Sequence, residues 1–191
     1  YWLGSDEDYL DIVFLAHESN GQSINSEDAY LNLRNYYSAK GEDPNFADDS
    51  ISRGWDYVGL SWRDSNSFGI QTFSTLVDLR YFLKNGPLQG EHEELNTWET
   101  YDVYLQRKQV HGITLAAEYD LHANYKYFKG VKTTINYQTG YVDAFDYSSI
   151  RAEFTLKFDV PFMIWYSKGY DSDLIGYHKK IESVGIAVEL K

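Results

Sequence analysis

Apolar and polar residues alternate along most of this chain, and such a period of two is typical of β-strands with one apolar and one polar face. The alternation is clearest over 131–138, 149–158 and 183–190. It predicts about eight strands, at 8–19, 53–64, 68–82, 99–122, 128–139, 147–158, 161–168 and 181–190. The fourth stays in phase across a polar centre at Arg107, Gln109 and His111, so it is either one strand projecting beyond a membrane or two strands.

The connections between these strands alternate in length. Residues 20–52, 83–98 and 169–180 form long links, whereas 64–67 and 159–161 are short. Short turns at one end of a sheet and long loops at the other are typical of bacterial outer-membrane barrels. Tyr and Trp also gather near the strand ends, as in the aromatic girdles of membrane proteins. The pattern therefore favours an all-β fold, a transmembrane antiparallel up-and-down β-barrel, over a soluble β-sandwich.

Composition narrows the classes of function. The chain is 17% aromatic, yet its mean hydropathy is -0.51, and no apolar run reaches the roughly 18 to 20 residues of a membrane-spanning helix. The formal net charge of -12 argues against nucleic acid, whose binders gather Lys and Arg against phosphates. There are no cysteines, which excludes disulfides and thiolate metal sites. Residues 1–10 show no signal peptide, so we expect a processed chain or a fragment.

The candidate chemistry lies in the segment His17-Glu18-Ser19-Asn20-Gly21-Gln22-Ser23, at the end of the first predicted strand. Residues i and i+2 of a strand share a face, so His17 and Ser19 project side by side. That spacing is too short for His17 to activate Ser19 directly unless the strand bends. The Asn20-Gly21 pair that follows supplies a turn. A lone His-x-Ser near a loop is more often polar surface than a catalytic pair.

Nucleophilic catalysis also needs a group that orients the base, and the next strand offers one. On alternation alone, the first strand's apolar face holds Val13, Leu15, His17 and Ser19, and the second strand's holds Asp56, Val58, Leu60 and Trp62. If both faces point to lipid, the Asp56 carboxylate and the His17 imidazole meet across two antiparallel strands. Polar groups of this kind on a lipid-facing surface are costly and usually functional.

These residues resemble the signature of the outer-membrane phospholipase A family of Gram-negative bacteria. Its first motif, His-x-Ser-Asn-Gly-x-Ser, is complete at 17–23, and its second, Ser-Arg-x-Trp-Asn, is matched at 52–56 except at the last position. Weaker similarity continues through 136–141, 166–170 and 184–188. The resemblance implies a twelve-stranded barrel in the bacterial cell outer membrane, with its active site on the outer wall.

The resemblance also implies a role for each matching residue. Ser19 is the nucleophile that attacks an acyl ester of a phospholipid, His17 is the general base, and Asp56 orients His17. Ca²⁺ is the implied cofactor, with the backbone carbonyl of Gln22 and the hydroxyl of Ser52 as ligands, and it polarises the ester carbonyl through bound water. The implied active form is a homodimer in contact with outer-membrane lipid.

The sequence departs from the family pattern in three places. Asp56 stands where Asn is usual, but a carboxylate also orients histidine in Ser-His-Asp triads. Gln22 stands where Arg is common, and this change is tolerated because the implied calcium ligand is the backbone carbonyl. The link 24–51 is longer than the family's and acidic, which favours a solvated extracellular loop over a cation-capturing one. The chain begins just before the catalytic strand, so we expect one β-barrel domain, 1–191, that lacks its N-terminal strands.

The leading prediction is a phospholipase A that hydrolyses acyl esters of outer-membrane phospholipids through a Ser19 acyl-enzyme, with calcium. Two alternatives stay open. One is a non-enzymatic outer-membrane barrel, a pore or a scaffold, in which the motif survives only as structure. The other is a barrel hydrolase that deacylates another lipid, such as lipopolysaccharide.

Overall fold

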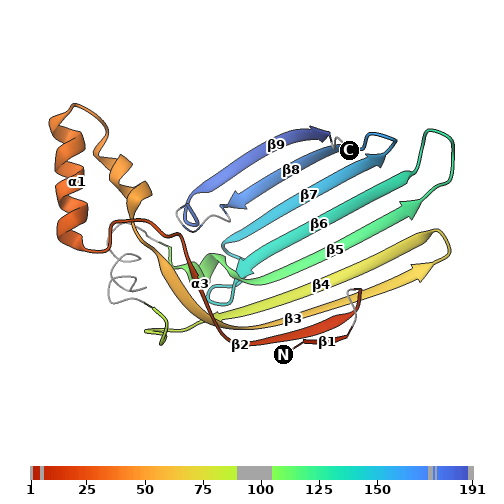
Figure 1. The fold of residues 1–191 in the computed structure, drawn as a ribbon, viewed down its shortest axis with the longest axis horizontal. Helices are drawn as coiled ribbons and strands as arrows, with labels where there is room; N and C mark the ends of the chain where they lie inside the picture. The colour runs from red at the N-terminus through yellow and green to blue at the C-terminus, as the bar shows by residue number, and fades with distance from the viewer. Residues whose placement is uncertain (1, 5–6, 90–104, 172–173, 175, 189–191) are drawn as a thin grey trace.

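A computed structural model describes residues 2–4, 7–89, 105–171, 174 and 176–188, and their strands form one antiparallel sheet. The strands are β1 (Trp2–Gly4), β2 (Tyr9–Ser19), β3 (Gly54–Phe68), β4 (Gln71–Phe82), β5 (Gly112–His122), β6 (Gly130–Gly140), β7 (Ser148–Lys157), β8 (Phe162–Tyr170) and β9 (Lys180–Val188). Each strand pairs with the next in sequence, so the topology is up-and-down (Figure 1). The predicted all-β, antiparallel up-and-down class is confirmed; within the described residues, the sheet stays open between β1 and β9.

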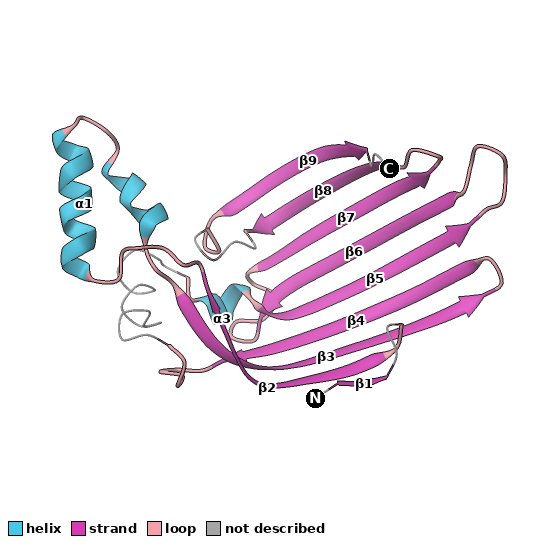
Figure 2. Ribbon diagram, viewed as in Figure 1, coloured by secondary structure: helices cyan, strands magenta, loops and turns pink. Residues whose placement is uncertain are grey.

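The short helices lie at one end of the sheet (Figure 2). They are α1 (Glu27–Ala39), the 3-10 segment η1 (Pro44–Ser50) and α3 (Arg107–Val110). Of the helices in the described ranges, none is both long and apolar enough to cross a membrane. The fold is therefore mainly a sheet, and the helices belong to the long connections at one end of it.

Residues 24–51 form a helical arm where the sequence predicted a solvated loop, so the loop prediction is wrong in conformation. Ser26 caps α1 by accepting a hydrogen bond from the Ala29 N–H at 3.3 Å. The arm has a small core of its own, made by Ile24, Tyr30, Ala47 and Ile51. In α1 only Tyr30 is buried, so no apolar stripe marks this helix in the sequence.

The fourth predicted strand, 99–122, is confirmed from residue 112 onward and wrong at its polar centre. Residues 99–104 lie outside the described residues, 107–110 form α3, and only Gly112–His122 form β5. Gln106 and Gln109 close a capping box that starts the helical turn at the polar centre. That turn brings Arg107 and Val110 into the interior together, which an extended strand with a period of two does not do.

The turn predicted at 64–67 lies a few residues further on, because β3 and β4 pair as far as Phe68 and Gln71. Gly69 has φ +64, a conformation that glycine adopts without steric cost. Ser65 belongs to the ladder, and its hydroxyl contacts that of Ser74 at 2.5 Å. The three-residue β1, which pairs with β2, was not predicted.

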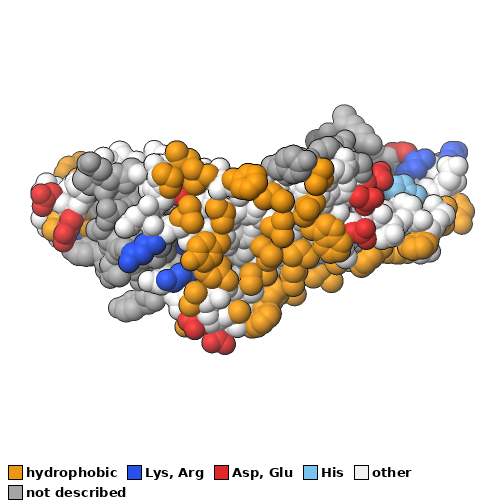
Figure 3. All heavy atoms as spheres, turned by 90° about the horizontal axis from the view of Figure 1, so that it is seen from below, with side chains coloured by type: hydrophobic (Ala, Val, Ile, Leu, Met, Phe, Trp, Pro, Cys, Tyr) orange, Lys and Arg blue, Asp and Glu red, His pale blue; other side chains and the backbone are white. Residues whose placement is uncertain are grey.

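One face of the sheet is apolar and the other is polar. Across β3 to β9 the apolar face carries exposed large side chains, among them Leu60, Leu79, Leu115, Ile135, Ile150, Ile164 and Ile186. Figure 3 shows hydrophobic side chains gathered over the sheet in this way. The opposite face carries ion pairs such as Lys132–Glu118 at 2.8 Å. This division is the one that a barrel wall needs between lipid and lumen.

Candidate active site

A β-bulge in β2 sets the direction of the candidate catalytic residues. Val13 pairs with Gly59 and Ala16 with Tyr57, so Phe14 and Leu15 together oppose the single residue Val58. The extra residue reverses the alternation, and Val13 lies on the opposite face from His17. The predicted continuous face from Val13 to Ser19 is therefore wrong, because a bulge cannot be recognised from a run of apolar residues.

Beyond the bulge, His17 pairs with Asp56 in register, so both side chains lie on the face that also carries Val58 and Leu60. Nδ1 of His17 lies 2.7 Å from Oδ1 of Asp56. The Asp56 side chain is fully buried, whereas 25% of the His17 side chain is exposed. The structure thus brings the predicted base and its orienting group into direct contact, and the ring edge with Nε2 faces away from Asp56.

The segment that follows β4 buries Asp56 from the outside. The Leu88 N–H donates to Oδ2 of Asp56 at 2.6 Å, and the Leu83 N–H donates to the Asp56 carbonyl at 2.8 Å. Gly86 lies so close that a Cβ there would stand 2.3 Å from Asp56 Cβ. Residues 83–89, called the clamp below, therefore cover the carboxylate on the apolar face of the sheet.

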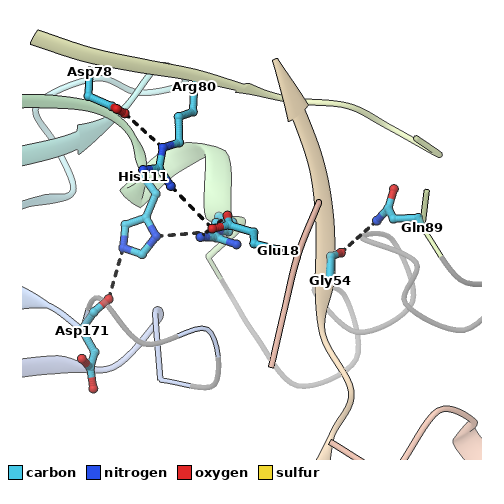
Figure 4. A network of polar contacts seen from close by, with 8 residues as sticks. Glu18, Gly54, Asp78, Arg80, Gln89, His111 and Asp171 are labelled. Carbon is cyan, nitrogen blue, oxygen red and sulfur yellow. Dashed lines mark hydrogen bonds and ion pairs between the residues drawn. The ribbon is translucent and has the colours of Figure 1, made fainter. Parts of the chain in front are cut away.

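Gln89 fixes the clamp to the catalytic end of the sheet. Its side-chain amide donates to the Gly54 carbonyl at 2.9 Å, a contact drawn in Figure 4. Its side-chain oxygen accepts from the Gly86 N–H at 2.9 Å. One side chain thus joins β3, beside Ser19 in the register, to the turn that touches Asp56.

Ser19 ends β2 and is exposed, and the turn after it is held by side chains. The Gly21 N–H donates to the Ser19 hydroxyl at 3.2 Å, and Gly21 has φ +62. Asn20 reaches the returning chain twice: its amide donates to the Ile51 carbonyl at 2.8 Å, and its oxygen accepts from the Arg53 N–H at 2.9 Å. The Asn-Gly pair therefore makes the bend that the sequence predicted and also fastens the base of the arm.

The predicted calcium ligands lie on two segments that run together at the base of the arm. The Ser52 N–H donates to the Ile24 carbonyl at 2.7 Å, and the Ile24 N–H donates to the Ser50 carbonyl at 3.0 Å. Gln22 is exposed and Ser52 is buried. In the described part of the chain, no group of three or more His, Cys, Asp or Glu side chains is placed to hold a metal ion. The donors here are neutral oxygens, which are suitable ligands for Ca²⁺ but supply only part of its shell of six to eight.

Behind the site, on the polar face, an ionic network holds the end of β2 (Figure 4). Oε1 of Glu18 lies 2.5 Å from Nη2 of Arg107, and Oε2 lies 3.5 Å from Nη1 of Arg80. The Arg107 guanidinium also stacks over Trp55, 4.4 Å from the ring centroid. Since Glu18 lies between His17 and Ser19 in sequence, this network fixes the backbone from which both project.

His111, at the end of α3, completes this network. Its Nδ1 accepts from Nε of Arg107 at 3.4 Å, and its Nε2 contacts the Asp171 carbonyl at 3.1 Å. Burial, with the nearby Arg107 charge as a second cause, lowers the pKa of His111 from 6.5 to about 4. At neutral pH this imidazole is therefore uncharged.

An apolar groove of about 560 Å³ runs along the sheet, and its lining includes Val58, two residues after Asp56. Its lining includes Ile12, Phe14, Val58, Leu60, Leu79 and Tyr81. Val58 follows Asp56 by two residues on the same face, and the exposed Phe14 of the bulge forms one side. The candidate residues thus lie between a polar arm and an apolar groove.

Sequence reasoning missed the clamp and the ionic network. The only local signal for the clamp is the turn-forming run Asn85-Gly86-Pro87, which marks a turn but not the carboxylate beneath it. For Glu18 and Arg107 the sequence shows two charged residues 89 positions apart. Contacts between distant segments depend on register and on the path of the connections.

The fold and site together define a class: an antiparallel up-and-down sheet of barrel-wall type, with a His–Asp pair and a serine on its apolar face. Neither a protein-family model nor a curated protein sequence matches this chain. Among solved structures it is similar to outer membrane phospholipase A from Escherichia coli, with a TM-score of 0.53 and 15% sequence identity.

That similarity covers 100% of this chain and 56% of the other, so the chain spans little more than half the length of the solved structure. At this identity the likeness shows the fold alone. The relationship is thus structural and distant, and it places this sheet with a β-barrel protein of the outer membrane.

Proposed function

We propose that this chain carries the active site of a calcium-dependent phospholipase A of the bacterial outer membrane. The observation that carries the proposal is the 2.7 Å contact between His17 and Asp56 on the apolar face of the sheet, two residues before Ser19. Polar groups on a face that meets lipid are costly and are usually functional. A lipid substrate accounts for their position, since it presents its ester bond from the same side.

In the proposed reaction, the Ser19 hydroxyl gives its proton to Nε2 of His17 while Oγ bonds to the ester carbonyl carbon. The ester C–O bond then breaks, and His17 passes that proton to the departing lysophospholipid oxygen. Water next attacks the acyl group: His17 takes its proton, the acyl–Ser19 bond breaks with release of fatty acid, and Ser19 recovers a proton from His17. Asp56 orients the ring and stabilises its cation.

Ca²⁺ would polarise the ester carbonyl and stabilise the oxyanion that forms there. The Gln22 carbonyl and the Ser52 hydroxyl are the donors proposed to hold it. Asn20 supports this assignment, because its side chain ties the Ser19 turn to Ile51 and Arg53 on either side of Ser52. The remaining ligands come from water, from substrate or, in the proposed homodimer, from a second copy of the chain.

The choice of phospholipid rests on the surroundings of the pair. The groove of about 560 Å³ beside His17 is almost wholly apolar, which suits an acyl chain. The exposed apolar face of the sheet suits the hydrocarbon region of the outer membrane. The polar arm would face the head group, and the apolar groove would take the acyl chain.

The test measures fatty-acid release from phospholipid in mixed micelles by the full-length protein, with Ca²⁺ or with a chelator. We expect Ser19→Ala to lower the rate by about 10⁴-fold or more, since loss of the nucleophile removes the covalent route. Ser38→Ala is the matched control, because Ser38 is exposed on α1. A sulfonyl fluoride should label the wild-type protein at Ser19 and spare the Ser19→Ala variant.

Equal rates for wild type and Ser19→Ala would refute the proposal. Ion conductance in planar bilayers without hydrolysis or labelling would favour a pore. Faster acyl release from lipopolysaccharide than from phospholipid would keep the serine mechanism but change the substrate.

A further inference from the structure

The Asp56 carboxylate meets two donors, one at each oxygen. Oδ1 lies 2.7 Å from Nδ1 of His17, and Oδ2 accepts from the Leu88 N–H at 2.6 Å. The side chain is fully buried, so water does not replace either contact. A carboxylate has two acceptor oxygens and no donor, and it satisfies both neighbours at once.

The two donors differ in what they can do. The Leu88 donor is a backbone N–H, which is always a donor. The imidazole of His17 has two tautomers, and the proton can sit on Nδ1 or on Nε2. Facing a carboxylate, Nδ1 carries the proton, and Nε2 is left with the lone pair that a general base needs.

An amide at position 56 cannot serve both neighbours, because it has one acceptor oxygen and one donor nitrogen. Its oxygen must face the Leu88 N–H, since that donor is fixed. Its NH₂ group then faces Nδ1 of His17, which becomes the acceptor and moves the ring proton to Nε2. In that tautomer His17 cannot take the Ser19 proton.

The clamp cannot easily move away to relieve this conflict. A Cβ at Gly86 would stand 2.3 Å from Oδ2 of Asp56, so the turn and the side chain at position 56 already lie in close contact. The Gln89 side chain bonds both the Gly54 carbonyl and the Gly86 N–H, at 2.9 Å each. Leu83 donates to the Asp56 carbonyl at 2.8 Å and fixes the start of the segment.

We propose that residues 83–89 are a positioning element that makes this site depend on a carboxylate at position 56, acting through the Leu88 N–H. The inference rests on the proposed function for its catalytic consequence, but the tautomer of His17 can be measured without turnover.

The experiment measures the His17 tautomer by ¹⁵N NMR of the full chain in detergent micelles, together with kcat and KM for phospholipid. Wild type should carry the proton on Nδ1. In Asp56→Asn the proton should move to Nε2, and kcat should fall about 100-fold or more with little change in KM, as expected for a base in the wrong tautomer.

Leu88→Pro removes the fixed donor, and Leu88→Ala keeps it. In the Asp56→Asn background, Leu88→Pro frees the amide to turn its oxygen to His17, so it should return the proton to Nδ1 and restore kcat at least tenfold. Leu88→Ala should restore neither.

Retention of the Nδ1 proton in Asp56→Asn would overturn the inference, and this result needs no active enzyme and no folded Leu88→Pro variant. A kcat for Asp56→Asn within about threefold of wild type would also overturn it. If the tautomer moves as expected but wild type hydrolyses no phospholipid, the clamp is supported and the proposed function fails.

Discussion

Arg107 is the centre of the ionic network behind the candidate site, and its loss should destabilise the fold strongly. Its Nη2 lies 2.5 Å from Oε1 of Glu18, its guanidinium stacks 4.4 Å from the Trp55 centroid, and only 5% of its side chain is exposed. Removing one partner of a buried pair costs about 3–5 kcal/mol, because the other charge is left unpaired. Glu18 is 22% exposed and keeps Arg80 at 3.5 Å, which reduces that cost. The lost stacking adds about 1 kcal/mol, so we expect Arg107→Met to lower the free energy of unfolding by about 3 kcal/mol.

Arg151 is a control with a comparable ion pair and a comparable aromatic contact. Its Nε lies 2.6 Å from Oε1 of Glu153, and its guanidinium stacks 4.4 Å from the Trp165 centroid. It is far more exposed than Arg107, since 43% of the Arg151 side chain is accessible. Exposed ion pairs contribute less than about 1 kcal/mol, so Arg151→Met should cost no more than that.

The assay is urea-induced unfolding in detergent micelles, followed by tryptophan fluorescence, for both variants. A double-mutant cycle of Arg107→Met with Glu18→Gln should give a coupling energy of about 1.5–3 kcal/mol. Equal losses for the two arginines would refute the reasoning, because burial would then not decide the energy of the pair. A loss below about 1 kcal/mol for Arg107→Met would refute it as well.

Two further changes test the packing around α3. Gly140→Ala places a methyl group 2.2 Å from the Lys108 carbonyl oxygen and should lower the free energy of unfolding by about 1–3 kcal/mol. Gly59→Ala is the control, because its nearest contact is at 3.4 Å, and it should leave that free energy unchanged. Equal urea midpoints for the two variants would contradict this prediction. The pKa of His111 is lowered from 6.5 to about 4, so its neutral form stabilises the fold above pH 6.5 and that stabilisation is lost as pH falls through about 4. Urea unfolding of the wild type should show a loss of unfolding free energy on the order of 3 kcal/mol over this pH range. The His111→Gln variant should not show this loss. The same pH dependence in wild type and variant would disprove the prediction.

Most of the sheet was predictable from local alternation. Strands β6 to β9 lie close to their predicted ranges, and alternation of apolar and polar residues is clearest in β6, β7 and β9. The failures occur where local pattern is ambiguous. The turn of α3 at Arg107 keeps the same spacing of polar residues as a strand, and α1 buries only Tyr30, so neither shows a helical stripe.

The candidate site was predictable only in part. The motif residues His17 and Ser19 and the carboxylate Asp56 could be named from sequence, and the cross-strand contact of His17 with Asp56 agrees with the structure. The reasoning that led to that contact was wrong, because it assumed unbroken alternation from Val13. The β-bulge between Val13 and Ala16 shifts the register, and this shift places His17 on the same face as Asp56. The catalytic and calcium-binding roles themselves stay predictions.

The sequence by itself determined most of the strands and the residue types of the site, because a period of two and a short motif are local properties of the chain. Only the tertiary structure decided which groups meet at Asp56. The Leu88 N–H belongs to a segment 32 residues away, and it reaches the carboxylate through the pairing of β3 with β4 and the turn at Gly86. A contact of this kind depends on register and chain path, and those follow from the whole sheet.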